Sequence, residues 1–100
     1  MENVNIDWLA GFCPVQAEGT IDGLPFYFRA RGRRWRIGIG GDRVMNPMWG
    51  YGELYGTGPF DAGWMSEDEA LVFIEKAVGL YRSGHPTTDM ELLVRQPDEV

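Results

Sequence analysis

The fold is decided by residues 15–39, which read VQAEGTIDGLPFYFRARGRRWRIGI. The dipeptide Asp22-Gly23 is a favoured centre for a two-residue type I′ hairpin turn. A turn there places only apolar residues and glycine opposite one another on one face, in the pairs Ile21–Leu24, Gly19–Phe26 and Ala17–Phe28. The other face then carries Gln16, Glu18, Thr20, Tyr27 and Arg29. One register thus separates a dry face from a wet face, which predicts a β-hairpin.

A second two-residue turn at Gly32-Arg33 extends this hairpin into a meander. This turn again pairs apolar residues with apolar residues on the buried face, in the pairs Ala30–Trp35, Phe28–Ile37 and Phe26–Ile39. Because both turns bury the same face of the middle strand, we predict antiparallel strands at residues 14–21, 24–31 and 34–40. We also expect the ring of Phe26 to cover Gly19 on the neighbouring strand.

A helix is predicted over residues 67–83. Ser66 and Glu69 have the spacing of a capping box, in which the serine accepts a hydrogen bond from the Glu69 amide and the glutamate reaches back. The apolar residues that follow repeat at helical spacing and form one stripe, made of Ala70, Phe73, Ile74, Ala77, Val78 and Tyr81. Gly84 and Pro86 end the helix. We expect the apolar stripe to lie on the dry face of the sheet.

Residues 41–63 lack a regular pattern and are rich in glycine and aromatic residues. Prolines at positions 47 and 59 discourage a central strand there. We therefore predict an ordered loop, in which residues 51–55 offer at most a short strand. Loops of this length are often functional.

The two ends of the chain are less regular. Residues 6–12 are expected to give Trp8, Leu9 and Phe12 to the core. In the tail, 84–100, residues 91–95 form either an edge strand or a short helix. The chain is therefore predicted to be one α+β domain, residues 1–100, with an antiparallel three- to five-stranded β-meander packed on one C-terminal α-helix.

Length, composition and charge limit the class of protein. A chain of 100 residues, 44% of them hydrophobic, buries enough surface to fold without disulfides or metals. The longest apolar run, 70–74, is too short to cross a bilayer, and the N-terminus has no signal-peptide pattern. The single cysteine suits a reducing compartment. We expect a soluble, cytoplasmic protein without membrane contacts, and the net charge of −6 argues against general nucleic-acid binding.

Groups for catalysis are scarce. A nucleophilic Cys13 needs a base, and His85 is the only histidine, with no spacing that brings the two together. We expect Cys13 to be a buried structural residue and His85 a solvated loop residue. One histidine, one cysteine and scattered acids match no zinc pattern, and residues 38–42 lack the lysine of a phosphate-binding loop. The prediction is no enzyme, no metal and no cofactor.

The one unusual surface is basic. Five of the nine basic residues lie within eight positions, namely Arg29, Arg31, Arg33, Arg34 and Arg36. Without them, four basic residues remain against fifteen acidic ones, a charge of −11. In the predicted register Arg29 faces Arg36 and Arg31 faces Arg34, on the wet face beside Tyr27. Like charges directly opposite each other destabilise a sheet.

Two interpretations of this face stay open. In the first interpretation, acids such as Glu18, or acids of the loop and tail, pair with the arginines and form a surface network. Alternatively, the face recognises an anion, because arginine forks match phosphate and carboxylate groups and Tyr27 offers a ring for stacking. We identify no element that covers this face.

The loop supplies a second candidate surface, which contains Trp49, Tyr51 and Tyr55, with Phe60, Trp64, Met45 and Met48 in the same stretch. Aromatic residues and methionine are enriched at protein interfaces. The alternative is that they complete a core that one helix is too small to cover.

In its small size, acidity, shortage of catalytic groups and concentrated arginine and aromatic residues, the chain resembles small phage- and mobile-element-encoded inhibitors, anti-CRISPR proteins among them. The resemblance is one of overall character and covers no alignable stretch. It implies a protein that blocks a host defence complex in the host cytoplasm, by occluding a nucleic-acid or subunit surface.

From the residues we predict a non-enzymatic binding or inhibitory protein that engages a larger protein or ribonucleoprotein. One alternative is a module that binds nucleic acid directly through the arginine hairpin. The other is a small ligand-binding protein or enzyme that uses the aromatic loop.

Overall fold

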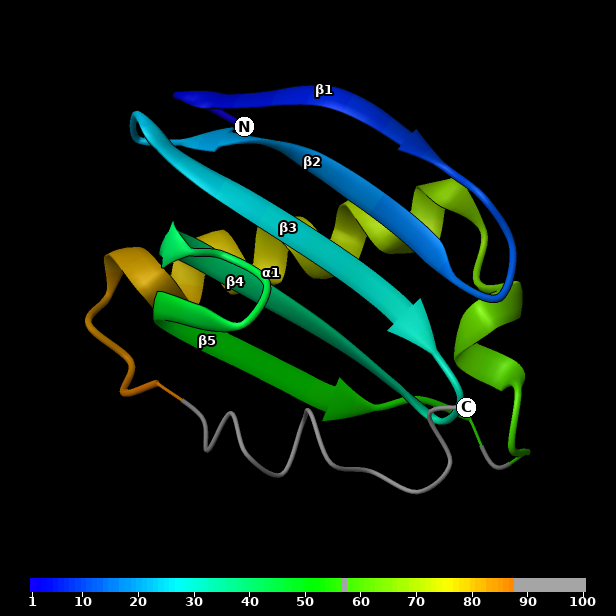
Figure 1. Cartoon of the computed structure of the whole chain (residues 1–100). Helices are drawn as coiled ribbons and strands as arrows, with labels where there is room; N and C mark the ends of the chain where they lie inside the picture. Colours follow the sequence, from blue (N-terminus) through cyan, green and yellow to red (C-terminus); the bar gives the residue numbers. More distant parts are fainter. Residues whose placement is uncertain (57, 88–100) are drawn as a thin grey trace.

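The computed structural model describes residues 1–56 and 58–87. Within them, five strands form one antiparallel sheet in the order β1-β2-β3-β4-β5, and one α-helix lies across one face (Figure 1). The elements are β1 (Val4–Ala10), β2 (Val15–Ile21), β3 (Leu24–Arg31), β4 (Arg34–Asp42), β5 (Asn46–Leu54), the 3-10 helix η1 (Asp61–Trp64) and α1 (Glu67–Arg82). The predicted α+β meander with one helix is confirmed. The two alternatives for residues 91–95 lie outside the described residues.

Both predicted hairpins have the expected register. Asp22 and Gly23 have φ values of 51° and 82°, the left-handed conformation that a type I′ turn requires at both positions. Every predicted pair is present, from Ile21–Leu24 to Ala17–Phe28 between β2 and β3 and from Ala30–Trp35 to Phe26–Ile39 between β3 and β4. Turn chemistry and hydrophobic alternation therefore set the centre of the sheet.

Strand β1 is the outer strand on one side, and it corrects the prediction for the N-terminal core residues. Leu9 pairs with Ala17 and packs against the core, but Trp8 pairs with Glu18 on the opposite face. Trp8 is 41% exposed, and Phe12, which lies in the loop beyond the strand, is 71% exposed. Adjacent residues of a strand point to opposite faces, so Trp8 and Leu9 cannot both enter the core.

Strand β5 forms where we predicted a loop. It pairs with β4 along its length and is the outer strand on the other side of the sheet. An outer strand tolerates Pro47, because a proline there costs no hydrogen bond to a second neighbour. The strand also alternates: Trp49 and Tyr51 lie opposite Ile39 and Ile37 on the core side, whereas Gly50 and Gly52 lie on the other face.

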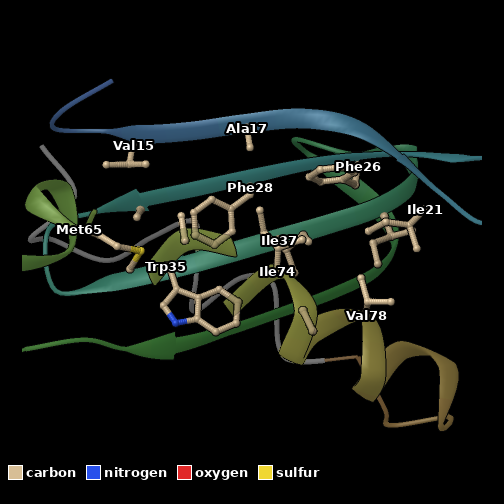
Figure 2. Packing of buried hydrophobic residues seen from close by; sticks show 14 of the residues in the cluster. Val15, Ala17, Ile21, Phe26, Phe28, Trp35, Ile37, Met65, Ile74 and Val78 are labelled. Carbon is tan, nitrogen blue, oxygen red and sulfur yellow. The ribbon is translucent and has the colours of Figure 1, made fainter. Parts of the chain in front are cut away.

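The core lies between the sheet and α1 (Figure 2). Trp35 is fully buried and stacks on Phe73 of α1 with ring centroids 5.1 Å apart. The helix begins with the predicted capping box, in which Ser66 Oγ accepts from the Glu69 amide at 3.1 Å and the Ser66 amide donates to Glu69 Oε1. Among the described residues, no helix is long and apolar enough to span a membrane.

Candidate functional site

The register places the arginines of β3 and β4 on the face of the sheet that points away from α1, here called the outer face. Arg29 pairs with Arg36 and Arg31 pairs with Arg34, as predicted. The residues between them, Ala30 on β3 and Trp35 on β4, are buried in the core. Two adjacent cross-strand pairs therefore each set one positive charge against another.

The exposure of these arginines differs from the prediction, because part of the outer face is covered. Arg34 and Arg36 are only 9% and 4% exposed, whereas Arg29 and Arg31 are half-buried and Arg33, in the turn, is exposed. The turn between β4 and β5 folds back over the outer face, where the carbonyl oxygen of Val44 accepts a hydrogen bond from Arg36 Nη2.

Glycines make this close approach sterically feasible. A Cβ at Gly38 would overlap the carbonyl oxygen of Arg43, and the position opposite Arg36 on β5 is Gly52. Our expectation that nothing covers this face is therefore wrong for the β4 half of the outer face. The β3 half keeps Arg29 and Arg31 partly accessible to solvent.

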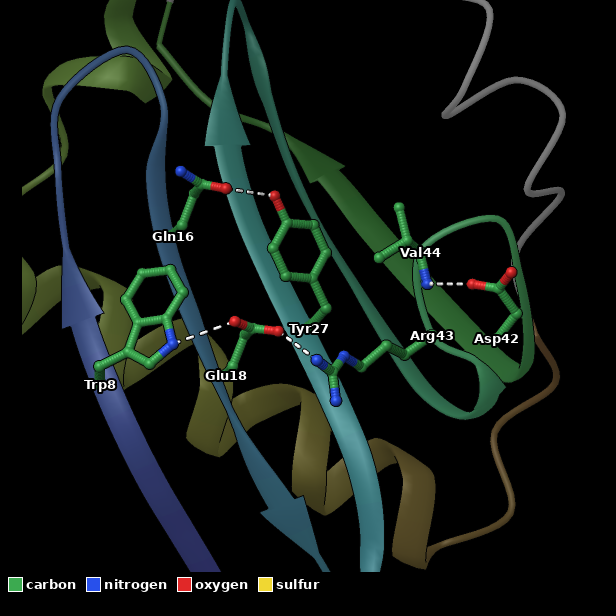
Figure 3. A network of polar contacts seen from close by, with 7 residues as sticks. All are labelled: Trp8, Gln16, Glu18, Tyr27, Asp42, Arg43 and Val44. Carbon is green, nitrogen blue, oxygen red and sulfur yellow. Dashed lines mark hydrogen bonds and ion pairs between the residues drawn. The ribbon is translucent and has the colours of Figure 1, made fainter.

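Glu18, on the outer face, already binds two other side chains (Figure 3). Glu18 Oε1 accepts from Arg43 Nη2 in the β4–β5 turn, and Glu18 Oε2 accepts from Trp8 Nε1 at 3.0 Å. Tyr27 donates its hydroxyl to Gln16 Oε1 at 2.6 Å. Glu18 thus forms a surface network, but with Arg43 and with none of the five clustered arginines. The acids at positions 88–100, which we also considered as partners, lie outside the described residues.

Three of those arginines lack a partner in the part of the chain that the structure describes. Within residues 1–56 and 58–87, the side chains of Arg29, Arg31 and Arg34 form no hydrogen bond or ion pair, and Nε of Arg34 is buried without an acceptor. A buried donor without an acceptor costs free energy, roughly 1–3 kcal/mol and more when the group is charged. An anion that reaches this row would recover part of that cost.

The aromatic residues and methionines of residues 41–64, most of which we predicted to be a loop, divide into two groups. Trp49 is 8% exposed, and its Nε1 donates to the carbonyl oxygen of His85 at 2.7 Å. Tyr51 stacks on Trp49, and Tyr55 packs edge-on against Phe73. These three residues complete the core, which was one of our two interpretations. Phe60, Trp64, Met45 and Met48 are instead 60–69% exposed.

The hydroxyl of Tyr51 belongs to a chain of hydrogen bonds that reaches Lys76 on α1. Its hydroxyl donates to Glu53 Oε2 at 2.6 Å, and Lys76 Nζ reaches the same oxygen at 2.5 Å. Burial, strengthened by the hydrogen bond to Glu53, raises the pKa of Tyr51 from 10 to about 12. Burial also acts to raise the pKa of Glu53, but the hydrogen bonds from Lys76 and Tyr51 outweigh it and lower that pKa.

A raised tyrosine pKa makes the stability of the protein sensitive to alkali. The folded state holds Tyr51 neutral, so this contribution is complete below pH 10 and is lost as the pH rises to about 12. We expect the free energy of unfolding to fall more steeply between those pH values in the wild type than in Tyr51→Phe. Urea unfolding at a series of pH values measures the two slopes, and equal slopes would contradict the assignment.

Cys13 and His85 are not brought together. Cys13 is exposed, contrary to our prediction, because it lies in the β1–β2 loop, where its amide donates to the carbonyl oxygen of Gly63 just before α1. His85 follows the other end of α1. A helix of 16 residues is about 24 Å long. In the described part of the chain, no group of three or more His, Cys, Asp or Glu residues is arranged to hold a metal ion.

A depression in the surface lies elsewhere. It has a volume of about 510 Å³ and is lined by Asn3, Val4, Asn5, Thr20, Asp22 and Gly23. These residues belong to the start of β1 and the β2–β3 turn, and none of the loop aromatics reaches them. The depression therefore gives no support to a ligand pocket built from Trp49, Tyr51 and Tyr55.

Fold and site together define an α+β meander domain in which Arg29, Arg31 and Arg34 form a row on the outer face, without a partner among the described residues. No protein-family model, curated protein or solved structure matches this chain. The resemblance to small phage-encoded inhibitors therefore rests on composition alone.

Proposed function

We propose that the chain is a non-enzymatic binding protein that engages a larger protein or protein–nucleic-acid complex through its outer face, at β3 and the start of β4. The observation that carries the proposal is the unpaired row of Arg29, Arg31 and Arg34. The chain has fifteen acidic residues to neutralise nine basic ones, yet these three stay without a partner among the described residues. Complementary charge steers association and fixes the register of a complex, and arginine is enriched at binding hot spots.

The charge distribution favours a protein-containing partner over free nucleic acid. Nucleic-acid binding proteins neutralise many phosphates at once, and their affinity depends on the number of such contacts. Here Arg36 is covered by the β4–β5 turn, Arg34 is nearly buried, and the chain outside the five arginines carries −11. A phosphate backbone that extends beyond the row would meet that negative charge. Following the resemblance in composition, we propose further that the partner is a complex that the chain inhibits.

Reversing one charge on the outer face tests the proposal. Tagged wild type, Arg29→Glu and Arg82→Glu are used to capture partners from cells that encode the chain, with quantitative mass spectrometry as the readout. Arg82 is the matched control, because its reversal changes the net charge equally but lies on α1, where Arg82 pairs with Asp22. Proteins held by the wild type and by Arg82→Glu should be reduced at least about tenfold with Arg29→Glu, since losing one partner of a buried charge pair costs about 2–5 kcal/mol.

A gel-shift assay with purified protein separates the second candidate function. Direct nucleic-acid binding predicts a shift that weakens steeply with salt and is lost in Arg29→Glu. The proposed function predicts no shift at physiological salt. Equal capture of the same proteins by all three forms would show that the outer face is not the binding surface.

A further inference from the structure

Three exposed aromatic side chains belong to two segments that meet at one end of the sheet, namely the β1–β2 loop and η1 with its N-cap residue. Phe12, Phe60 and Trp64, here called the aromatic end, are 71%, 60% and 66% exposed. Phe12 comes from the β1–β2 loop and Trp64 from η1, and their ring centroids are 5.6 Å apart. Aromatic side chains bury about 150–250 Å² each, so the three rings expose on the order of 400 Å² of apolar surface. The largest apolar patch on a typical monomer has about this size, and it is often functional.

The aromatic end is held by backbone hydrogen bonds from three parts of the chain. The Cys13 amide donates to the carbonyl oxygen of Gly63 at 2.9 Å, and the Ala62 amide donates to that of Gly32 at 3.0 Å. Gly63 packs so closely on the β1–β2 loop that a Cβ there would lie 2.7 Å from Cys13 Sγ. Figure 1 shows this loop, the β3–β4 turn and η1 at the same end of the sheet. Rings on such a framework lose little conformational freedom when they bind.

Charges of both signs flank the aromatic end. Arg31 ends β3, next to the turn that η1 contacts. Glu67 and Asp68 open α1, three and four residues after Trp64, and both are exposed. A phosphate backbone or a purely acidic surface would gain Arg31 but would meet these two carboxylates. The occupant that fits must carry an apolar centre with a positive and a negative flank.

A second copy of this chain has that arrangement. We propose that the aromatic end is a self-association surface, through which two copies pair about a two-fold axis. Rotation about such an axis places Arg31 of one copy against Glu67 and Asp68 of the other, in both directions, with the aromatic rings between them. A standard interface takes about 800 Å² from each partner, of which the rings supply roughly half. This inference goes beyond the proposed partner binding, which uses the row of Arg29, Arg31 and Arg34 on the outer face and shares only Arg31 with the interface between copies.

The mass of the purified protein in solution tests the proposal. Sedimentation equilibrium should give twice the chain mass of 11.3 kDa for the wild type and the single-chain mass for Trp64→Glu. Met45→Glu is the matched control, because Met45 is 65% exposed in the β4–β5 turn, at the opposite end of β4 from the aromatic end, and its variant should stay dimeric. A wild type that remains monomeric up to about 1 mM overturns the proposal, since such a contact is weaker than a specific interface provides. A dimer that survives Trp64→Glu places the interface elsewhere and also overturns it.

A charge exchange tests the two-fold pairing itself. Arg31→Glu and Asp68→Arg should each be monomeric, because each sets like charges against each other twice in the interface. Mixed in equal amounts, the two variants should form a heterodimer of twice the chain mass, since every flank then meets its opposite. Failure of the mixture to associate overturns the proposed pairing, and so does association of the wild type that a nuclease abolishes. Trp64→Glu should still capture the partners of the wild type, which keeps the two proposals distinguishable.

Discussion

Trp35→Ala is expected to lower the free energy of unfolding by about 3–5 kcal/mol, the usual cost of removing a buried tryptophan. Trp35 is fully buried at the centre of the core. Its ring centroid lies 5.1 Å from that of Phe73 on α1 and 5.7 Å from those of Phe28 and Tyr51. Alanine would leave a cavity between β4 and the only α-helix in the described residues. Urea unfolding followed by circular dichroism measures the loss.

Trp35→Phe should cost far less, about 1 kcal/mol or below. Phenylalanine keeps an aromatic ring against Phe73 and removes the indole Nε1, which is buried without a hydrogen-bond partner among the described residues. Leaving such a donor unpaired costs roughly 1–3 kcal/mol, so its removal offsets part of the lost packing. If the two substitutions destabilise the protein equally, the ring stacking is not what Trp35 contributes.

The central hairpins were predictable because their signals are local. Asp22-Gly23 specifies the turn, and the alternation on either side admits one register that keeps Phe26 and Phe28 dry. The helix was equally readable, since Ser66 and Glu69 satisfy each other within one turn. In both cases the residues that determine the structure are neighbours in the sequence.

Strand β5 was missed because proline and glycine were weighed as breakers without knowledge of the strand's position. At the edge of a sheet, Pro47 loses nothing, and Gly50 and Gly52 face outward while Trp49 and Tyr51 face the core. The alternation of aromatic residues with glycine was a period-two signal that could have identified the strand.

The candidate site was predictable in register but not in exposure. The sequence places Arg36 on the outer face, yet its burial depends on a turn that folds back over Gly38. Likewise Glu18 finds Arg43, 25 residues away, rather than the nearer arginines. The aromatic end depends on the contact between Cys13 in the β1–β2 loop and Gly63, which no local sequence pattern predicts. Contacts between distant backbone segments decide all three features.

Gly19→Ala is expected to destabilise the protein by about 3 kcal/mol, at the upper end of the cost of overpacking a core. A Cβ at Gly19 would overlap the carbonyl oxygen of Asn5 on β1 and lie 2.9 Å from Cε2 of Phe26. Neither neighbour yields easily, because Phe26 is fully buried and β1 is paired with β2 on both sides of this point. The new methyl group must therefore displace β1 or the central ring of the meander.

Gly79→Ala is the matched control, with the opposite sign. A Cβ at Gly79, in α1, meets nothing within 4 Å, so alanine should raise the free energy of unfolding by about 1 kcal/mol through its better helix propensity. The same chemical change is thus expected to destabilise at one glycine and stabilise at the other. Urea unfolding of both variants decides the matter. If Gly19→Ala is neutral, β1 does not lie against β2 as closely as the sheet requires, and the outer strand carries less of the stability than its pairing implies.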